Sequence, residues 1–249
     1  MATDSSPSPR FSIITICLNE AEGIRRTCES IEAQTYRNFE WVVVDGGSTD
    51  GTLEILETYK HQIQTFVSGP DGGIYEAMNK GLALASGDYM LFMNGGDSFA
   101  SEDVLQKVSD APPKDLIYGD VYLGHARGNL ATYPDVMSRG YLLRNMVPHQ
   151  ATFYRRTLFE QYGNYDTRYR IAGDYELYIR LLEVHRVSYH HIAKPLAVFD
   201  LGGISASKRH RILRKQENHA IRMKHFPRYR WSPKAWRQSL RNLMKAGKP

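Results

Sequence analysis

Apolar runs and helical patterns alternate over the first hundred residues. Four runs rich in β-branched and aromatic residues predict strands at Phe11–Cys17, Phe39–Asp45, Ile63–Val67 and Tyr89–Met93. Apolar residues at helical spacing between these runs predict a helix over 21–34, a short helix carrying Leu53 and Leu56, and a helix from Tyr75 to Ala85. Because the strands are apolar throughout, we expect a parallel sheet with helices on both faces.

The second half of the chain lacks this rhythm. Leu116–Leu123 and Leu130–Tyr133 flank a Gly-containing turn and predict a hairpin. Further strands are expected at Gln150–Tyr154, Val187–Ile192 and Leu196–Leu201, and a helix is expected over 174–185. The pattern indicates an α/β fold with a Rossmann-like, mostly parallel first half and a mixed α+β second half.

Composition is that of a globular protein, with 249 residues, 42% apolar and 24% charged. Two cysteines, Cys17 and Cys28, exclude a disulfide framework and fit a reducing compartment. No apolar run is long enough to span a membrane, and residues 1–9 lack the apolar core of a signal peptide. We expect a disordered tail at 1–9, a catalytic domain over 10–207, an extension over 208–249, and a cytoplasmic location.

The net charge of +5 is unevenly distributed. The extension holds 14 Lys and Arg but one acid, Glu217, whereas acids exceed bases in the rest of the chain. Within it, Ser232-Pro233 is a typical helix start. An apolar stripe with basic neighbours then follows at Trp236, Leu240, Leu243 and Met244.

Such a basic amphipathic helix suits an anionic membrane surface, so we expect peripheral attachment to the inner face of the plasma membrane. Packing of the stripe on the body or on another subunit is the alternative. No nucleic-acid-binding motif accompanies the charge, which argues against nucleic acid as the partner.

Polar residues follow each of the first four predicted strands. They are Asn19-Glu20, Asp45, Asp71 and Asp97. In open parallel sheets ligands bind beyond the carboxyl ends of the strands, so these residues are expected to line one crevice, although any single one could be a helix cap. Their oxygens suit Mg²⁺ or Mn²⁺ bridging to phosphates. The dinucleotide, P-loop and hydrolase motifs are absent, which leaves a metal-assisted enzyme acting on a phosphorylated ligand.

Four segments in register carry a resemblance to family 2 glycosyltransferases, over roughly residues 10–205. They are Thr15–Glu20, Val44–Thr52, Gly72–Gly81 and Gly87–Asp97. The chain is most similar to bacterial enzymes that build exopolysaccharides or decorate glycolipids. The resemblance implies a GT-A fold, a nucleotide-sugar donor, transfer with inversion, and a glycan or lipid-linked acceptor.

The resemblance also assigns roles to single residues. It places in the nucleotide and donor pocket Thr15, Cys17, Asn19, Glu20, Asp45, Gly46, Asp71, Asn79, Asn94 and Gly95. Asp97 matches the last acid of the metal motif, which implies Mn²⁺ or Mg²⁺. The family commonly has three acids in this motif, and Asn94-Gly95-Gly96 leaves one. A metal held by Asp97 and the donor diphosphate is expected, with metal independence as the alternative.

Asp174 aligns with the catalytic base of the family, within Gly173-Asp174-Tyr175-Glu176. A base is needed because an acceptor hydroxyl is a poor nucleophile until its proton is removed. A helix cap is the alternative for Asp174, and Glu176 is the second candidate base. His149 and Arg155 are candidates for contacts to acceptor or phosphate.

Two other functions compete with transfer. One is a degenerate module that binds a nucleotide sugar without turnover, which the lost acids at 94–96 favour. The other is a sugar nucleotidyltransferase, which requires a Gly-rich basic loop after the first strand. Cys17-Leu18-Asn19-Glu20 is not such a loop.

Overall fold

The computed structural model describes residues 8–124, 129–202 and 208–246. The chain forms two compact units, which are described separately. Unit 1 comprises residues up to 135 with 147–164 and 188–201, and unit 2 comprises 136–146, 165–187 and the segment from 202 onward. Of the predicted disordered tail, 1–7 lie outside the described residues. The carbonyl groups of Ser8 and Pro9 accept hydrogen bonds from Asn38 and Tyr36.

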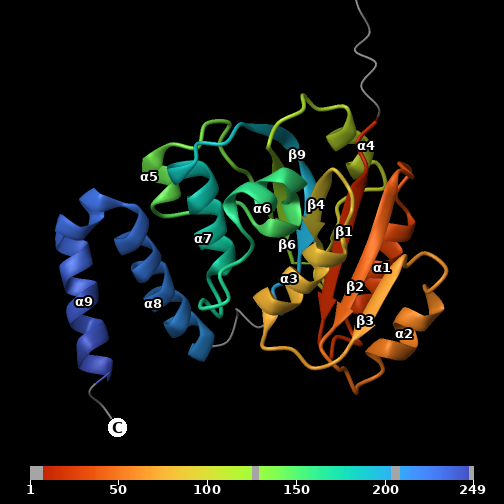
Figure 1. Ribbon diagram of the computed structural model, residues 1–249, viewed down its shortest axis with the longest axis horizontal. Coiled ribbons are helices and arrows are strands. Elements are labelled where there is room, and N and C mark those ends of the chain that lie inside the picture. The colour runs from red at the N-terminus through yellow and green to blue at the C-terminus, as the bar shows by residue number, and fades with distance from the viewer. Residues whose placement is uncertain (1–7, 125–128, 203–207, 247–249) are drawn as a thin grey trace, which may run out of the picture. The chain divides into compact units, whose positions relative to one another are not determined.

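Unit 1 is built on one sheet with the strand order β3-β2-β1-β4-β8-β6-β9-β5, and β7 pairs with β6 (Figure 1). Its strands are β1 (Phe11–Cys17), β2 (Phe39–Asp45), β3 (Thr65–Ser68), β4 (Tyr89–Phe92), β5 (Ser98–Phe99), β6 (Leu116–Leu123), β7 (Leu130–Ala131), β8 (Thr152–Arg155) and β9 (Tyr189–Phe199). Its helices are α1 (Ile24–Glu32), α2 (Thr52–Thr58), α3 (Ile74–Leu84), α4 (Val104–Ser109), η1 (His149–Ala151) and α6 (Arg156–Tyr162).

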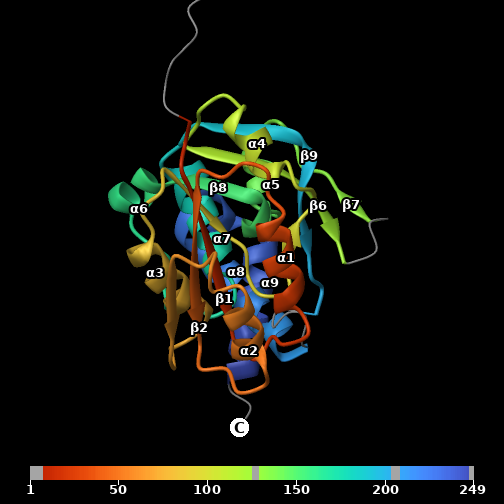
Figure 2. The same ribbon diagram turned by 90° about the vertical axis from the view of Figure 1, so that its right-hand side faces the viewer.

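The first half of the sheet is parallel, as predicted. β1 pairs with β2 and β4, and β2 pairs with β3, all in parallel. Every residue of β1 is buried, because α1 covers one face of this half and α3 covers the other (Figure 2). Trp41 of β2 is wholly buried, and its indole N–H donates to the Thr15 hydroxyl. The apolar strands therefore form the core on which the loops at their carboxyl ends rest.

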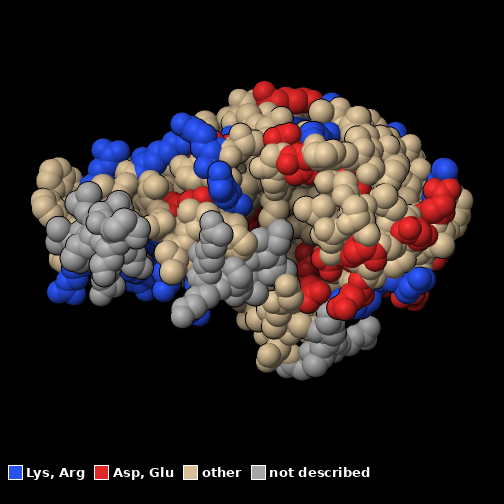
Figure 3. All heavy atoms as spheres, turned by 90° about the horizontal axis from the view of Figure 1, so that it is seen from below, with Lys and Arg blue, Asp and Glu red and all other residues tan. Residues whose placement is uncertain are grey.

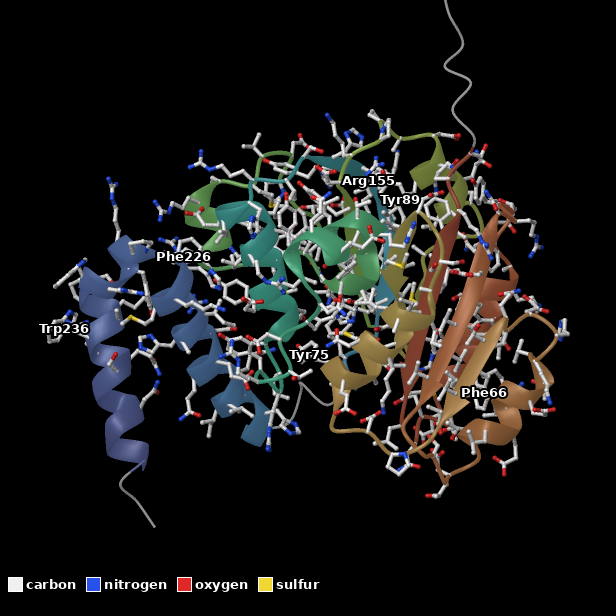
Figure 4. All side chains as sticks on the ribbon, in the orientation of Figure 1. Phe66, Tyr75, Tyr89, Arg155, Phe226 and Trp236 are labelled. Carbon is white, nitrogen blue, oxygen red and sulfur yellow. The ribbon has the colours of Figure 1, made fainter. Side chains whose placement is uncertain are left out.

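Strand β3 differs from the other strands of the parallel half because it is exposed. It is the last strand of the sheet, and it has a neighbour on one side only. Phe66 is 48% exposed and Val67 is 41% exposed (Figure 4). An apolar run alone does not distinguish an edge strand from a central one, since both carry β-branched and aromatic residues.

The second half of the sheet is mixed. The predicted hairpin is confirmed as the antiparallel pair β6–β7, and β8 pairs antiparallel with both β4 and β6. The two strands predicted at 187–192 and 196–201 are one strand, β9, which pairs in parallel with β6. The pairing shifts register at Gly119–Val121, opposite the residues 193–195 that separate the two predicted strands. The short elements β5, α4 and α6 were not predicted.

Unit 2 is helical. Its elements are α5 (Arg139–Leu142), α7 (Gly173–Ile179), η2 (Arg180–Val184), α8 (Lys208–His225), η4 (Pro227–Trp231) and α9 (Pro233–Ala246). The helix predicted over 174–185 is α7 continued by η2. The predicted start at Ser232 is confirmed, because its hydroxyl accepts a hydrogen bond from the Ala235 N–H. In the described part of the chain, no helix is long and apolar enough to cross a membrane.

Helices α8 and α9 form a hairpin held by a buried histidine. One ring nitrogen of His219 on α8 lies 3.1 Å from the Tyr229 hydroxyl, and the other lies 3.0 Å from the Ser239 hydroxyl on α9. Burial is the main reason why the pKa of His219 lies below its usual value. The side chains of Leu240, Leu243 and Met244, which belong to the predicted apolar stripe, lie outside what the structure describes.

Candidate functional site

The loops after β1, β2 and β4 meet at the carboxyl edge of the parallel strands. The Gly46 N–H donates to the Cys17 carbonyl at 2.9 Å, and the Gly95 N–H donates to the Ile16 carbonyl at 3.0 Å. Acidic side chains gather on the face of unit 1 that Figure 3 shows. The structure therefore brings the loops that contain Asn19, Asp45 and Asp97 to one edge, as the sequence predicts.

Asp45 organises the loop that follows β2. Its buried carboxylate accepts hydrogen bonds from the N–H groups of Gly47 and Ser48 and from the hydroxyls of Ser48 and Ser68. Burial alone would raise the pKa of Asp45, but these hydrogen bonds outweigh it and hold the pKa below its usual value. Because these groups donate to both oxygens of its carboxylate, Asp45 fixes the conformation of the loop after β2.

Asn19 connects the loop after β1 to the loop after β2. Its φ of 52° lies in the left-handed region, which Asn tolerates better than most residues. Its N–H donates to the Ser48 hydroxyl, and its side-chain oxygen accepts from the Thr49 N–H. The next residue continues the connection, since the Glu20 N–H donates to the Thr52 hydroxyl.

Asp71 reaches this edge from the loop before α3. A Cβ at Gly46 would lie 3.3 Å from an Asp71 carboxylate oxygen, so glycine leaves room for that carboxylate. The other Asp71 oxygen accepts from the Gly73 N–H, and Glu76 accepts from the Gly72 N–H. The N–H groups of Gly72 and Gly73, which directly precede α3, therefore donate to carboxylates of the chain itself. Asn79, on α3, is half-buried.

Asp97 ends the loop after β4, and it is only 5% exposed. One carboxylate oxygen accepts from the Asp200 N–H at 2.8 Å, and the Asp97 carbonyl accepts from the Thr27 hydroxyl. Burial raises the pKa of Asp97 to about 7, although His149 and the Asp200 N–H act in the opposite direction. The group is therefore poised to change charge near neutral pH.

Two further carboxylates surround this loop. A Cβ at Gly96 would lie 3.0 Å from an Asp200 oxygen and 3.1 Å from a Glu20 oxygen. Burial, and then the charge of Asp200, raise the pKa of Glu20, which Arg26 partly offsets. Asp200 was missed at the sequence level. It directly follows β9, but the strand predicted at Leu196–Leu201 includes this position, so the signal that identified the other acids, a carboxylate after a strand, did not identify it.

The 94–97 loop offers part of a site for a divalent metal ion. Among the described residues, no three Asp, Glu, His or Cys side chains are arranged to hold one. The 94–97 loop offers the Asp97 carboxylate and the buried Asn94 side-chain oxygen, which has no hydrogen-bond partner within the described chain. These hard oxygens fit Mg²⁺ or Mn²⁺ when a bound diphosphate supplies the remaining ligands.

His149 lies beside the same loop. Its Nε2 is 3.0 Å from the Asn94 side-chain nitrogen. The structure therefore brings His149 to the group around Asp97, as predicted.

Two predicted site residues lie elsewhere. Thr15 is wholly buried, and its hydroxyl accepts from Trp41, so this side chain belongs to the core. Arg155 pairs with Tyr89, the first residue of β4, at the opposite edge of the sheet (Figure 4). Its guanidinium donates to the Tyr89 hydroxyl at 3.0 Å and covers the ring. Cys17 ends β1, buried, with its sulfur 3.7 Å from Asp45.

Asp174 belongs to unit 2, where it lies in the first turn of α7. The cap position of this helix is Ala172, so Asp174 does not occupy the capping position that was the alternative. Its side chain is half-buried and accepts from the Tyr175 N–H at 2.7 Å.

Glu176, the second candidate base, is unsuited to that role. It is 1% exposed, and its carboxylate contacts Arg180, Lys224 and His225, each at 3.1 Å. Burial would raise the pKa of Glu176, but the His225 hydrogen bond and the two cations lower it to about 2. A carboxylate stabilised to this degree is a weak base, which favours Asp174 over Glu176 as the candidate base, and the contacts of Glu176 connect α7 to α8.

Sequence comparison places the chain among known relatives. A model described as Glycosyl transferase family 2 matches residues 12–163. The chain is 36% identical over 206 residues to the PGL/p-HBAD biosynthesis glycosyltransferase of Mycobacterium bovis (strain BCG / Pasteur 1173P2), with 80% of each chain covered. It is also 36% identical over 183 residues to an uncharacterized glycosyltransferase of Mycobacterium tuberculosis (strain H37Rv), covering 70% of this chain and 69% of that one.

Solved structures show the same fold. TarS 1–349 of S. aureus in complex with UDP-GlcNAc gives a TM-score of 0.69 at 18% identity, covering 87% of this chain and 67% of that chain. The chain spans 40% of a longer TarS chain. The mannosyltransferase PcManGT from Pyrobaculum calidifontis, in complex with GDP-Man and Mn²⁺, gives 0.66 at 21% identity, covering 90% of this chain and 66% of that chain. The expected GT-A fold is confirmed.

Proposed function

The chain belongs to glycosyl transferase family 2, and we propose that it transfers a sugar, with inversion, to a hydroxyl of a glycan or lipid-linked acceptor. The observation that carries the proposal is the meeting of the Asn19, Asp45, Asp71 and Asp97 loops at the carboxyl edge of β1, β2 and β4. Ligands of open parallel sheets bind at this edge. The structural neighbours hold UDP, UDP-GlcNAc and GDP-Man, which supports a nucleotide sugar as donor.

The acceptor we favour is a glycolipid precursor. The mycobacterial relative is named for PGL/p-HBAD biosynthesis, and it covers 80% of this chain. An exopolysaccharide intermediate carried on lipid would present the same chemistry, namely a sugar hydroxyl close to a membrane. In both cases the acceptor oxygen attacks the anomeric carbon in a single displacement.

Asp174 is the general base in this proposal. It takes the proton of the acceptor hydroxyl as the new glycosidic bond forms and the bond to the diphosphate breaks. The half-buried position of Asp174 and the unsuitability of Glu176 support the assignment. Asp97 and Asn94 would hold Mn²⁺ or Mg²⁺ together with the donor. When bound, the ion would neutralise charge on the diphosphate.

Nucleotide titration tests the donor site. Calorimetry against UDP, GDP, dTDP and CDP, each with Mn²⁺ and with EDTA, is expected to give tight binding of one nucleotide only when Mn²⁺ is present. The reason is that the described residues do not form a complete metal site, so ion and diphosphate should bind together. Nucleotide binding that EDTA does not change would show that the donor site needs no metal ion. Binding without transfer to membranes of the source cells would favour the degenerate module.

We also propose that unit 2 contacts the inner face of the plasma membrane. The hairpin tip, residues 227–237, carries Trp231 at 80% and Trp236 at 62% exposure. Ala235 and Ser239 mark the face of α9 that packs on α8, and Trp236 points away from α8 (Figure 4). Basic side chains lie along this hairpin (Figure 3), and those exposed at the tip are Arg228, Arg230, Lys234 and Arg237. Exposed Trp with flanking cations is typical of membrane-surface segments.

Vesicle sedimentation checks this surface. The protein is expected to bind phosphatidylcholine vesicles only when they contain phosphatidylglycerol, and replacing Trp231 and Trp236 with Ala should reduce binding by roughly tenfold or more. The control is Phe66→Ala, which removes an exposed aromatic ring from unit 1. An equal loss in both variants, or no wild-type binding, would contradict the assignment.

A further inference from the structure

Glu217 of α8 holds the backbone that leads into α7. Its two carboxylate oxygens accept from three consecutive N–H groups, those of Arg170, Ile171 and Ala172, at 2.8, 2.9 and 2.8 Å. Glu217 is 9% exposed, and it is the only acid in the 42-residue segment 208–249. A lone buried carboxylate in a strongly basic segment therefore has a defined set of partners, all of them backbone groups.

These backbone groups immediately precede the catalytic-base motif. Helix α7 begins at Gly173, and its cap residue Ala172 makes no side-chain cap hydrogen bond. The N–H groups at the start of a helix have no partner within the helix, and a carboxylate is favoured there by the helix dipole. Glu217 supplies that carboxylate from a segment that is distant in sequence. It thereby fixes the backbone from which Asp174 extends.

A second set of contacts holds the rest of α7 to α8. Glu176 on α7 contacts Lys224 and His225 on α8, and the Arg222 guanidinium donates to the Tyr175 hydroxyl and covers its ring. The two carboxylates connect the helices in both directions. Glu217 extends from α8 to the start of α7, and Glu176 extends from α7 to α8. Displacement of α8 would therefore release both ends of the segment 170–176.

We infer that Glu217 is a positioning residue for Asp174, and that α8 is part of the catalytic apparatus and does more than attach the enzyme to a membrane. This inference rests on the proposed role of Asp174 as the base. The loops expected to hold the nucleotide all belong to unit 1, whereas Glu217 and Asp174 belong to unit 2. Loss of Glu217 should therefore act on turnover and leave nucleotide affinity unchanged.

The test compares Glu217→Gln with Glu183→Gln. Glu183 is a partly buried carboxylate of the same unit, and its ion pair, at 2.9 Å, is with Arg139 of α5 and not with the start of α7. Release of nucleoside diphosphate from the nucleotide sugar is measured with membranes of the source cells as acceptor. Glu217→Gln is expected to lower kcat by about tenfold or more, with KM for the donor and nucleotide Kd within about twofold. Glu183→Gln is expected to retain wild-type kcat.

A double-mutant cycle separates positioning from general stability. If Glu217 acts through Asp174, Glu217→Gln has no further effect on the residual rate of Asp174→Asn. The inference would be overturned if the two losses of kcat multiplied in the double variant. An unchanged kcat in Glu217→Gln, or an equal loss in Glu183→Gln, would also overturn it. Where thermal unfolding shows that Glu217→Gln is unfolded at the assay temperature, Glu217→Asp takes its place in the same cycle. Failure of the proposed function is distinguishable, because the wild-type protein itself would then release no nucleoside diphosphate. Failure of the base assignment alone would leave Asp174→Asn fully active.

Discussion

Asp174→Asn is expected to abolish most transfer while leaving the donor site intact. Removing a general base costs roughly 10²–10⁴-fold in rate, and we expect a loss of kcat in that range. Asn preserves the size and the hydrogen bond from the Tyr175 N–H, so α7 should keep its structure. Steady-state release of nucleoside diphosphate measures kcat, and nucleotide titration of the same preparation measures the affinity of the donor site.

The matched control for this experiment is Asp166→Asn. Asp166 is also a carboxylate of unit 2, but it is paired with the exposed Arg168. We expect near wild-type turnover in this control. Full activity of Asp174→Asn would show that another group takes the acceptor proton. A parallel loss of nucleotide binding would show that the substitution damaged more than the base.

Asp97→Asn is expected to raise the stability of the folded protein and to lower its activity. Burial raises the pKa of Asp97 from 3.8 to about 7, so the folded protein favours the neutral form. Between these values the unfolded chain is charged and the folded chain is protonated, so this group lowers stability as the pH rises. The full cost, roughly 4 kcal/mol from the size of the shift, is reached above pH 7. Asn avoids it and can still accept from the Asp200 N–H.

Thermal unfolding at two pH values checks the stability half of this expectation. The variant should exceed the wild type in Tm at pH 8.5 by several degrees and by much less near pH 4. In the functional half, Mn²⁺-dependent nucleotide binding and transfer should fall by about a hundredfold or more, because the one carboxylate of the 94–97 loop is gone. A variant with wild-type Mn²⁺-dependent binding would remove Asp97 from the metal proposal.

The sequence identifies the parallel half of unit 1 well, and the reason is physical. β1 and β2 have the predicted bounds because buried parallel strands are apolar on both faces, which leaves a continuous run. The loops at their carboxyl ends follow from topology, so Asn19, Asp45 and Asp97 could be placed at one edge. What a side chain does within that edge could not be predicted, since Thr15 packs on Trp41 and Asp45 binds its own loop.

Other features depend on long-range partners that the pattern does not record. Arg155 is a candidate acceptor or phosphate contact on sequence grounds, but antiparallel pairing places it beside Tyr89 at the far edge. Glu176 lies within a family motif, yet its properties come from Lys224 and His225, nearly fifty residues later. The function of Glu217 is likewise set by the backbone at 170–172. Such roles follow from tertiary packing alone.

The loop after β2 has a consequence for how donor preference can change during evolution. Its shape depends on a few inward-facing polar groups, chiefly Asp45, Ser48 and the side chain of Asn19. Of the exposed residues, Asp50 also supports the loop, because its carboxylate accepts from the Ala21 N–H and from Thr52, whereas Thr49 contributes its backbone N–H to Asn19. A framework of this kind allows the side chain at an exposed position such as Thr49 to change without altering the loop. Outward-facing residues on such a support are the ones through which related folds can acquire pockets for different ligands.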